Sequence, residues 1–145
     1  MNKLLLLLHI VFIGVWLGCV VTEALFERAL LGQGRAQELI LVGLHKRVDI
    51  FVEIPAFLVV LVTGGLMWAN AAPSTALHAK IGFGVLAILA NVYCVWLVFR
   101  RAKAATAGDW EQFARLDLLQ HKFGAIVLIG ILGALGLGGY LYGVA

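Results

Sequence analysis

The sequence predicts an all-α integral membrane protein, built as an antiparallel, up-down-up-down bundle of four transmembrane helices. Hydrophobic residues make up 63% of its 145 residues, charged residues only 13%, and the mean hydropathy is +1.02. Lipid cannot satisfy free backbone groups, so an apolar run of about 20 residues crosses the bilayer as a helix. The chain has four such runs, and we expect residues 1–145 to form a single transmembrane domain. The runs span residues 4–26, 48–69, 79–99 and 123–143.

The connections between these runs carry helix stop and start signals. Pro73 follows the second run and should end its helix. Ser74 or Thr75 can then cap the third helix by accepting hydrogen bonds from its free amides. Asp109 stands three residues before Gln112, which is the spacing of a capping box. The fourth helix should therefore begin well before its apolar run.

Basic residues predict the orientation of the bundle. The N-terminus, the loop at 70–77 and the C-terminus should share one side of the membrane, which we call side A, and the connections at 29–44 and 102–120 the other, side B. Only Lys3 and Lys80 lie at side A. Side B should face the cytoplasm of a bacterial inner membrane, with both termini outside. The net charge of +3 follows from this bias and implies no nucleic-acid partner. The other nine of the eleven basic residues lie at side B: Arg28, Arg35, Lys46, Arg47, Arg100, Arg101, Lys103, Arg115 and Lys122.

Each apolar run has one histidine near one of its ends. By the direction of the helices, His9 and His78 belong to the side A half and His45 and His121 to the side B half. In an up-down-up-down bundle the first and third helices lie diagonally across the core, as do the second and fourth. The sequence therefore predicts two histidine pairs, one in each half of the membrane.

Helical periodicity predicts the face on which each histidine lies. Because His78 and Lys80 are about 200° apart around a helix, only one of them can point into the bundle. We expect His78 to point inward and Lys80 to extend to the headgroups. The shared faces are His9 with Trp16, Val20, Glu23 and Glu27; His45 with Asp49, Val52, Ala56, Val59 and Thr63; His78 with Gly82, Val85, Leu89, Val92 and Trp96; His121 with Ala125, Leu128, Leu132 and Gly139; and Lys80 with Gly84, Ala87 and Asn91.

Paired imidazoles with small residues beside them are typical of a haem site. The chain has no Cys-x-x-Cys-His motif, so a haem would be b-type and not covalently attached. We expect His9/His78 and His45/His121 to be axial ligands of haem iron, with two haems expected and one possible. Two alternatives stay open: imidazoles that only hydrogen-bond between helices, and another metal such as copper or zinc.

Two acidic residues near side B are further candidates for a site. Glu53 lies near the start of the second run and Glu23 near the end of the first. Quinol oxidation releases protons together with electrons, so either carboxylate could accept a proton at a quinone site. The alternative is that they pair with Arg47, Arg28 or Arg100 at the headgroup level.

Three segments of the chain resemble a known group of proteins. They are "LHIVFIGVWLG" at 8–18, "DIFVEIPAFLVVLVTGGLMW" at 49–68 and "LHAKIGFG" at 77–84. The chain resembles the small bacterial membrane proteins grouped with CopD-type copper-resistance proteins and HemJ-type protoporphyrinogen oxidases. This resemblance implies a helical haem-binding bundle in which His9 and Lys80 match a family histidine and lysine. The aromatic and basic motif that usually follows the first helix of HemJ-type enzymes is replaced by "CVVTEALFERAL".

The leading hypothesis is an integral membrane b-type cytochrome that transfers electrons between the quinone pool and a redox partner. With little chain outside the bilayer, the protein could be a subunit of a larger membrane complex. One alternative is a HemJ-like protoporphyrinogen oxidase with a single haem b. Another is a structural membrane anchor without haem. The sequence does not identify the electron donor or acceptor, or the direction of electron flow.

Overall fold

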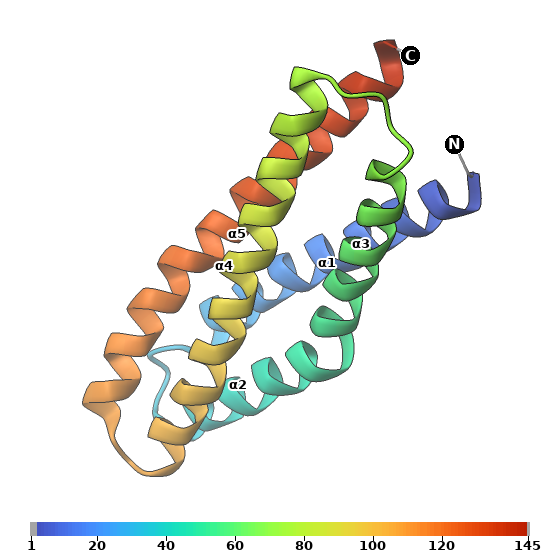
Figure 1. Cartoon of the computed structure of the whole chain (residues 1–145). Helices are drawn as coiled ribbons and strands as arrows, with labels where there is room; N and C mark the ends of the chain where they lie inside the picture. Colours follow the sequence, from blue (N-terminus) through green and yellow to red (C-terminus); the bar gives the residue numbers. More distant parts are fainter. Residues whose placement is uncertain (1–2, 145) are drawn as a thin grey trace.

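The computed structural model describes residues 3–144, which form helices joined by short loops (Figure 1). Within these residues, four helical stretches are long and apolar enough to cross a membrane, and no strand occurs. The prediction of an all-helical chain with four candidate spans is therefore confirmed. The elements are α1 (Lys3–Leu30), α2 (Arg35–Val48), the π-helix η1 (Asp49–Glu53), α3 (Ile54–Trp68), α4 (Thr75–Thr106) and α5 (Trp110–Val144).

Helices occupy most of both side B connections, and the last helix begins at Trp110, well before its apolar run, as the capping signal predicted. The connections expected over 29–44 and 102–120 are mostly helical, with turns only at 31–34 and 107–109. Both predicted caps occur: the Ser74 hydroxyl accepts from the Leu77 amide at 3.1 Å, and Asp109 Oδ1 accepts from the Gln112 amide at 3.0 Å. Gly108 ends the helix before this second cap with a φ of 75°, which only glycine adopts readily.

The second span bends where α2 passes into α3 (Figure 1). Pro55 has no amide hydrogen to donate to the preceding turn, and one turn of π-helix over Asp49–Glu53 absorbs the mismatch. The bend therefore lies just before Pro55. It presents both acidic ends of η1, Asp49 and Glu53, to the interior, where each is buried.

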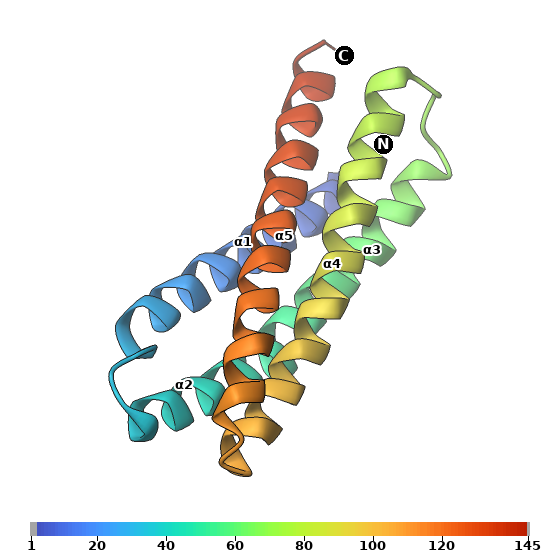
Figure 2. The ribbon, with the colours of Figure 1, turned by 90° about the vertical axis from the view of Figure 1, so that its left-hand side faces the viewer.

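The chain folds as two helical hairpins that cross at an angle (Figures 1 and 2). The α4–α5 hairpin is the tighter one, because small residues let the two backbones approach. A Cβ atom built on Gly130 would lie 2.8 Å from the Cβ of Ala87 and 3.0 Å from the Phe83 carbonyl oxygen. One built on Gly133 would lie 2.7 Å from the Phe83 ring. Close approach through glycine is how apolar helices associate in lipid, where dispersion contacts replace the hydrophobic effect.

The buried core is small and falls into two clusters. One cluster is near the middle of the spans, around Trp16, whose ring centre lies 6.0 Å from that of Phe57. The second is at the side B ends of α2, α4 and α5, around Leu97 and Phe113. Many large apolar side chains instead face outward along every span. Soluble proteins rarely expose so much apolar surface to water, so this surface indicates a multi-pass membrane protein whose outward side chains contact lipid.

The contact at Gly130 gives a test of this packing. Gly130→Val should destabilise the protein by about 1–3 kcal/mol, because the added side chain meets the backbone of α4, which cannot move aside cheaply. Gly136→Val on the same helix is the control, since a Cβ there meets nothing within 4 Å. Thermal loss of helical circular dichroism in detergent would measure both variants. Equal destabilisation would contradict the proposed contact.

Candidate functional site

Buried polar side chains gather in the side B half of the structure. They come from all four spans and form one connected group, which we call the polar cluster. Burial of so many ionisable groups among apolar helices is costly and is typical of functional sites in membrane proteins. Asp117 lies half-buried at the edge of the cluster. The buried members are Glu23 and Glu27 of α1, His45 of α2, Asp49 and Glu53 of η1, Asn91 and Arg101 of α4, and Gln120 of α5.

Arg101 lies at the centre of the polar cluster, and its side chain is fully buried. Its Nη2 donates to Oε1 of Glu27, and its Nη1 donates to Oδ1 of Asp117. These two ion pairs join α1, α4 and α5. A guanidinium carries a permanent charge, so its burial requires this pairing.

His45 contacts acidic groups with both ring nitrogens. Its Nδ1 lies 3.0 Å from Oε1 of Glu27, and its Nε2 lies 3.2 Å from Oε2 of Glu23. The Gln120 amide nitrogen lies 3.3 Å from each ring nitrogen, and Nη2 of Arg101 lies 3.2 Å from Nδ1. The imidazole is therefore enclosed by polar groups from three other elements.

Several oxygens of the polar cluster have no hydrogen-bond donor in the described structure. Both carboxylate oxygens of Asp49, whose residue is only 1% exposed, are without a donor, as is Oε1 of Glu23. Oε2 of Glu27 and Oε1 of Gln120 are also buried without a hydrogen-bond donor. An oxygen that is buried without a donor costs free energy, so protons or a bound group must supply what the side chains do not.

A hydrogen-bonded chain leads from the core to this acidic group. Nε1 of Trp16 donates to Oδ1 of Asn91 at 2.8 Å, and Nδ2 of Asn91 donates to Oε2 of Glu53 at 3.0 Å. The amide of Asn91 thus orients Glu53 from across the bundle. All three side chains are buried.

The polar cluster lines a cavity of about 690 Å³ between α1, the bent second span and the α4–α5 hairpin. Its acidic wall comes from Glu23, Glu27, Asp49 and Glu53, and its apolar wall includes Val20 and Val127. Both acidic residues expected at a site, Glu23 and Glu53, face this cavity. A small or flat molecule could reach the buried carboxylates here.

His9 occupies a separate polar position in the side A half. The imidazole is buried, and its Nδ1 lies 2.8 Å from Oγ1 of Thr63 on α3. A Cβ built on Gly64 would lie 3.1 Å from the His9 ring, so glycine makes room for the imidazole. The face predicted for His9 is confirmed, because Trp16, Glu23 and Glu27 are buried with it.

His78 does not point into the bundle, and that part of the prediction is wrong. His121 lines the cavity of the polar cluster beside Asp117, although half of its side chain is exposed. Both are exposed, and their Nδ1 atoms contact the carbonyl oxygens of Ser74 at 2.8 Å and Asp117 at 2.9 Å in their own helices. The face expected for His78 is the outer surface of α4, where Leu89 is 65% exposed. No hydrogen bond joins the predicted partners in His9/His78 or His45/His121 within residues 3–144.

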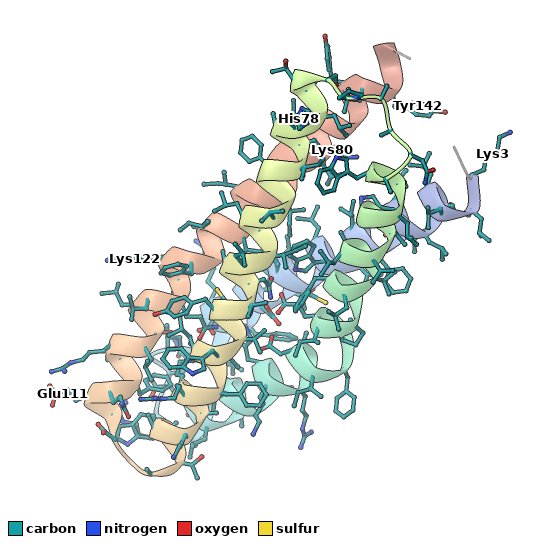
Figure 3. All side chains as sticks on the ribbon, viewed as in Figure 1. Lys3, His78, Lys80, Glu111, Lys122 and Tyr142 are labelled. Atoms are coloured by element: carbon teal, nitrogen blue, oxygen red, sulfur yellow. The ribbon has the colours of Figure 1, made fainter. Side chains whose placement is uncertain are left out.

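Neighbouring residues occupy the inner positions instead. Lys80 is half-buried at the side A end of α4, with its Cε 3.4 Å from a Cβ built on Gly138, and its charge interacts with the His9 imidazole. Figure 3 labels Lys80 and His78 near the start of α4. On α5, Gln120 rather than His121 reaches His45. Packing between helices sets the rotation of each helix and so decides which polar residues face inward. The periodicity along one helix does not reveal this rotation.

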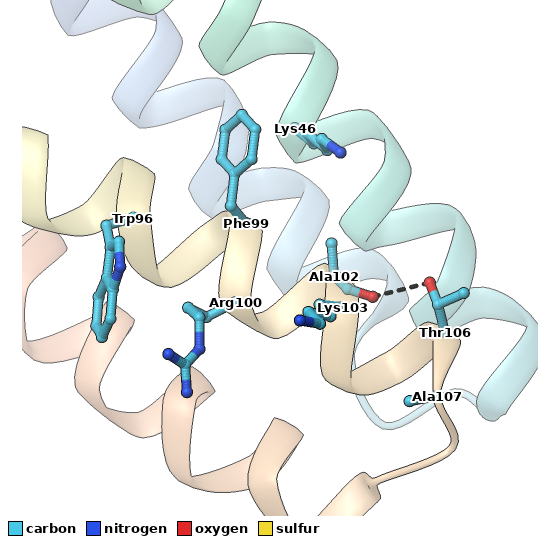
Figure 4. Close-up of a pocket in the computed structure, with 8 residues that line it drawn as sticks. All are labelled: Lys46, Trp96, Phe99, Arg100, Ala102, Lys103, Thr106 and Ala107. Atoms are coloured by element: carbon cyan, nitrogen blue, oxygen red, sulfur yellow. Dashed lines mark hydrogen bonds between the residues drawn. The ribbon is translucent and has the colours of Figure 1, made fainter.

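Outside the bundle, basic residues gather at the side B ends of α2 and α4 (Figure 4). Lys46 lies over the Phe99 ring at 4.9 Å and Arg100 over the Trp96 ring at 5.1 Å, with Lys103 beside them. These exposed cations fit the headgroup level of a membrane. The expected pairing of Glu23 or Glu53 with Arg28, Arg47 or Arg100 does not occur; the paired arginine is Arg101, through Glu27 and Asp117.

The central position of Arg101 can be tested by substitution. Arg101→Met should destabilise the protein by about 3–5 kcal/mol, because Glu27 and Asp117 lose their common partner while remaining in the interior. Adding Asp117→Asn should recover part of this loss. Arg100→Met, one residue away and exposed, is the matched control and should change stability by about 0.5 kcal/mol or less. Denaturant titrations of helical circular dichroism would measure these effects. Equal effects of the two arginine substitutions would contradict the assignment.

Comparison with known proteins gives no family assignment. No protein-family model matches the chain, and no match was found among curated proteins or solved structures. The resemblance to the CopD/HemJ-like group therefore stays a prediction.

Proposed function

We propose that the chain is an integral membrane b-type haem protein that passes electrons between the quinone pool and a redox partner, with His9 as an axial ligand of the haem iron. The observation that carries this proposal is the environment of His9. Its imidazole is buried near the side A end of the bundle and is oriented by a threonine hydroxyl. A haem held there would supply one-electron redox chemistry.

The hydrogen bonds of Thr63 favour the correct tautomer of His9. Oγ1 of Thr63 donates its only hydrogen to a carbonyl of its own helix, Val59 at 2.6 Å. With this hydrogen directed at the helix carbonyls of Val59 and Val60, we assign Oγ1 as the acceptor from His9, which places the proton on Nδ1 and the lone pair on Nε2. A histidine that ligates a metal through one nitrogen commonly donates the other N–H to an oxygen in this way. The donor set at His9 therefore fits an axial ligand.

Lys80 is the second nitrogen that we assign to this site. It is half-buried at the side A end of α4 with its side chain beside Gly138, and within residues 3–144 no carboxylate forms an ion pair with it. The outward position of His78 favours Lys80 over His78. The same observation favours the second candidate function, a HemJ-like oxidase with one haem b, because the resemblance implies His9 and Lys80 for that activity.

The polar cluster supports a proton-accepting role on the cytoplasmic side. Glu53 lines the cavity and is held by Asn91, so a quinol that entered there could transfer a proton to its carboxylate. The second haem expected at His45 and His121 has less support. A haem ligand at His45 would have to break the contact of one ring nitrogen with Glu23 or Glu27. We therefore propose one haem per chain, in a bacterial inner membrane with both termini outside.

The proposal is tested by the haem content of the purified protein. A pyridine haemochrome assay should give one haem b per chain, and His9→Ala should remove it. Thr63→Val keeps the side-chain shape but loses the acceptor for Nδ1, and should weaken haem affinity about 10- to 100-fold. Thr22→Val is the control, because Thr22 is exposed and bonds only to the Gly18 carbonyl of its own helix. A wild-type protein without haem would overturn the proposal, and two haems would restore the His45/His121 pair.

Lys80 and His78 should differ in their effect on the haem. Lys80→Ala should shift the reduced-minus-oxidised spectrum or lower the haem content, since we assign this half-buried nitrogen to the haem site. His78→Ala should leave both unchanged, because its ring lies on the outer surface of α4. The opposite result would return the site to the His9/His78 pair that the sequence predicted.

A further inference from the structure

We propose that Glu23, His45 and Asp49 form a binding site for a divalent transition-metal ion, distinct from the haem site at His9. One ligand atom from each of these three buried residues lies within 4.8 Å of the other two. His45 and Asp49 lie one turn apart in the second span, and the fold brings Glu23 of α1 to them. This inference does not depend on the proposed haem function.

The unpaired oxygens at this position indicate a missing positive group. Both carboxylate oxygens of Asp49 and Oε1 of Glu23 are buried without a hydrogen-bond donor. Asp49 is only 1% exposed. The polar cluster contains five carboxyl groups, those of Glu23, Glu27, Asp49, Glu53 and Asp117. Arg101 is its only permanent cation, and His45 adds a second positive charge only when it is protonated. Carboxylates that share one buried space require protons or a cation between them.

The surroundings of His45 favour a metal ion over protons alone. Nδ1 of His45 faces Oε1 of Glu27 at 3.0 Å, and this carboxylate is fixed in turn by Arg101. A histidine whose Nδ1–H is held by a carboxylate presents the lone pair of Nε2, which is the usual arrangement of a metal-bound imidazole. In this structure Nε2 is directed at Glu23.

The spacing of the ligand atoms also fits an ion. Nε2 of His45 and Oε2 of Glu23 are 3.2 Å apart. Two ligand atoms that each lie about 2.1 Å from one ion are about 3.0–3.4 Å apart in octahedral or tetrahedral geometry. Asp49 can complete the set with either free oxygen. One imidazole and two carboxylates form a nitrogen and oxygen ligand set suited to Zn²⁺ or Mn²⁺.

The π-helix gives a local reason for the site. Asp49 is the first residue of η1, and the wide turn begins four residues after His45. A π-turn inside a helix costs stability and frequently marks functional sites. Here it keeps Asp49 beside His45 and directs Glu53 to the same cavity.

Metal binding by the detergent-purified protein tests the proposal. After treatment with a chelator, isothermal titration with Zn²⁺, and separately with Mn²⁺, should show one site per chain for at least one of the two metals. Asp49→Asn should abolish that site. Glu27→Gln, which removes only the partner of Nδ1, should weaken binding about 10- to 100-fold. Glu111→Gln is the control, since this carboxylate is exposed and pairs with the exposed Arg115 on its own helix.

The outcomes separate this site from the haem site. His9→Ala should lose haem and keep the metal, whereas Asp49→Asn should lose the metal and keep haem and helical circular dichroism. If Asp49→Asn does not fold, the weakening of metal binding expected for Glu27→Gln tests the proposal instead. If the wild-type protein binds neither Zn²⁺ nor Mn²⁺ stoichiometrically, the proposal is wrong. Protons alone then neutralise these carboxylates. Unchanged binding in a folded Asp49→Asn, or in Glu27→Gln, also overturns it.

Discussion

The buried guanidinium of Arg101 is the constraint on which the side B half of the structure depends. Its charge cannot be removed by deprotonation, so the bundle must bring acidic groups to it. Glu27 arrives from α1 and Asp117 from α5, which ties both hairpins together at one point. Helices in lipid gain little from burying apolar surface against one another, so polar ties and close backbone contacts carry the association.

This tie also orients the rest of the polar cluster. Because Arg101 fixes Glu27, that carboxylate can fix Nδ1 of His45, and Nε2 is then directed toward Glu23 and Asp49. The bend at η1 is needed for the same arrangement, since it places Asp49 and Glu53 in the interior. Together they produce a cavity whose carboxylates outnumber its cations, and such a cavity is suited to receive protons or a metal ion.

The two halves of the bundle therefore differ in chemistry. On side A, Nδ1 of the buried His9 contacts the Thr63 hydroxyl, and Lys80 is half-buried at the same end of the bundle. On side B, the only buried histidine is surrounded by carboxylates in the described structure. The proposed division into an electron-carrying site and an acidic site for protons or a metal ion rests on these different surroundings, although all four histidines look alike in the sequence.

The sequence by itself determined the four spans, the caps at Ser74 and Asp109, and the buried faces of His9 and His45. Those features depend on hydropathy and on hydrogen bonds between residues a few positions apart, and both can be read from the local sequence. Only the tertiary structure decided that Gln120 rather than His121 reaches His45, that His78 faces outward, and that Arg101 is the buried arginine. Helix rotation is set by close contacts between distant residues, such as Gly130 against Ala87, and by charges that must meet across helices. In apolar spans hydrophobicity is similar on all sides, so the pattern along one helix cannot show which face its neighbours will cover.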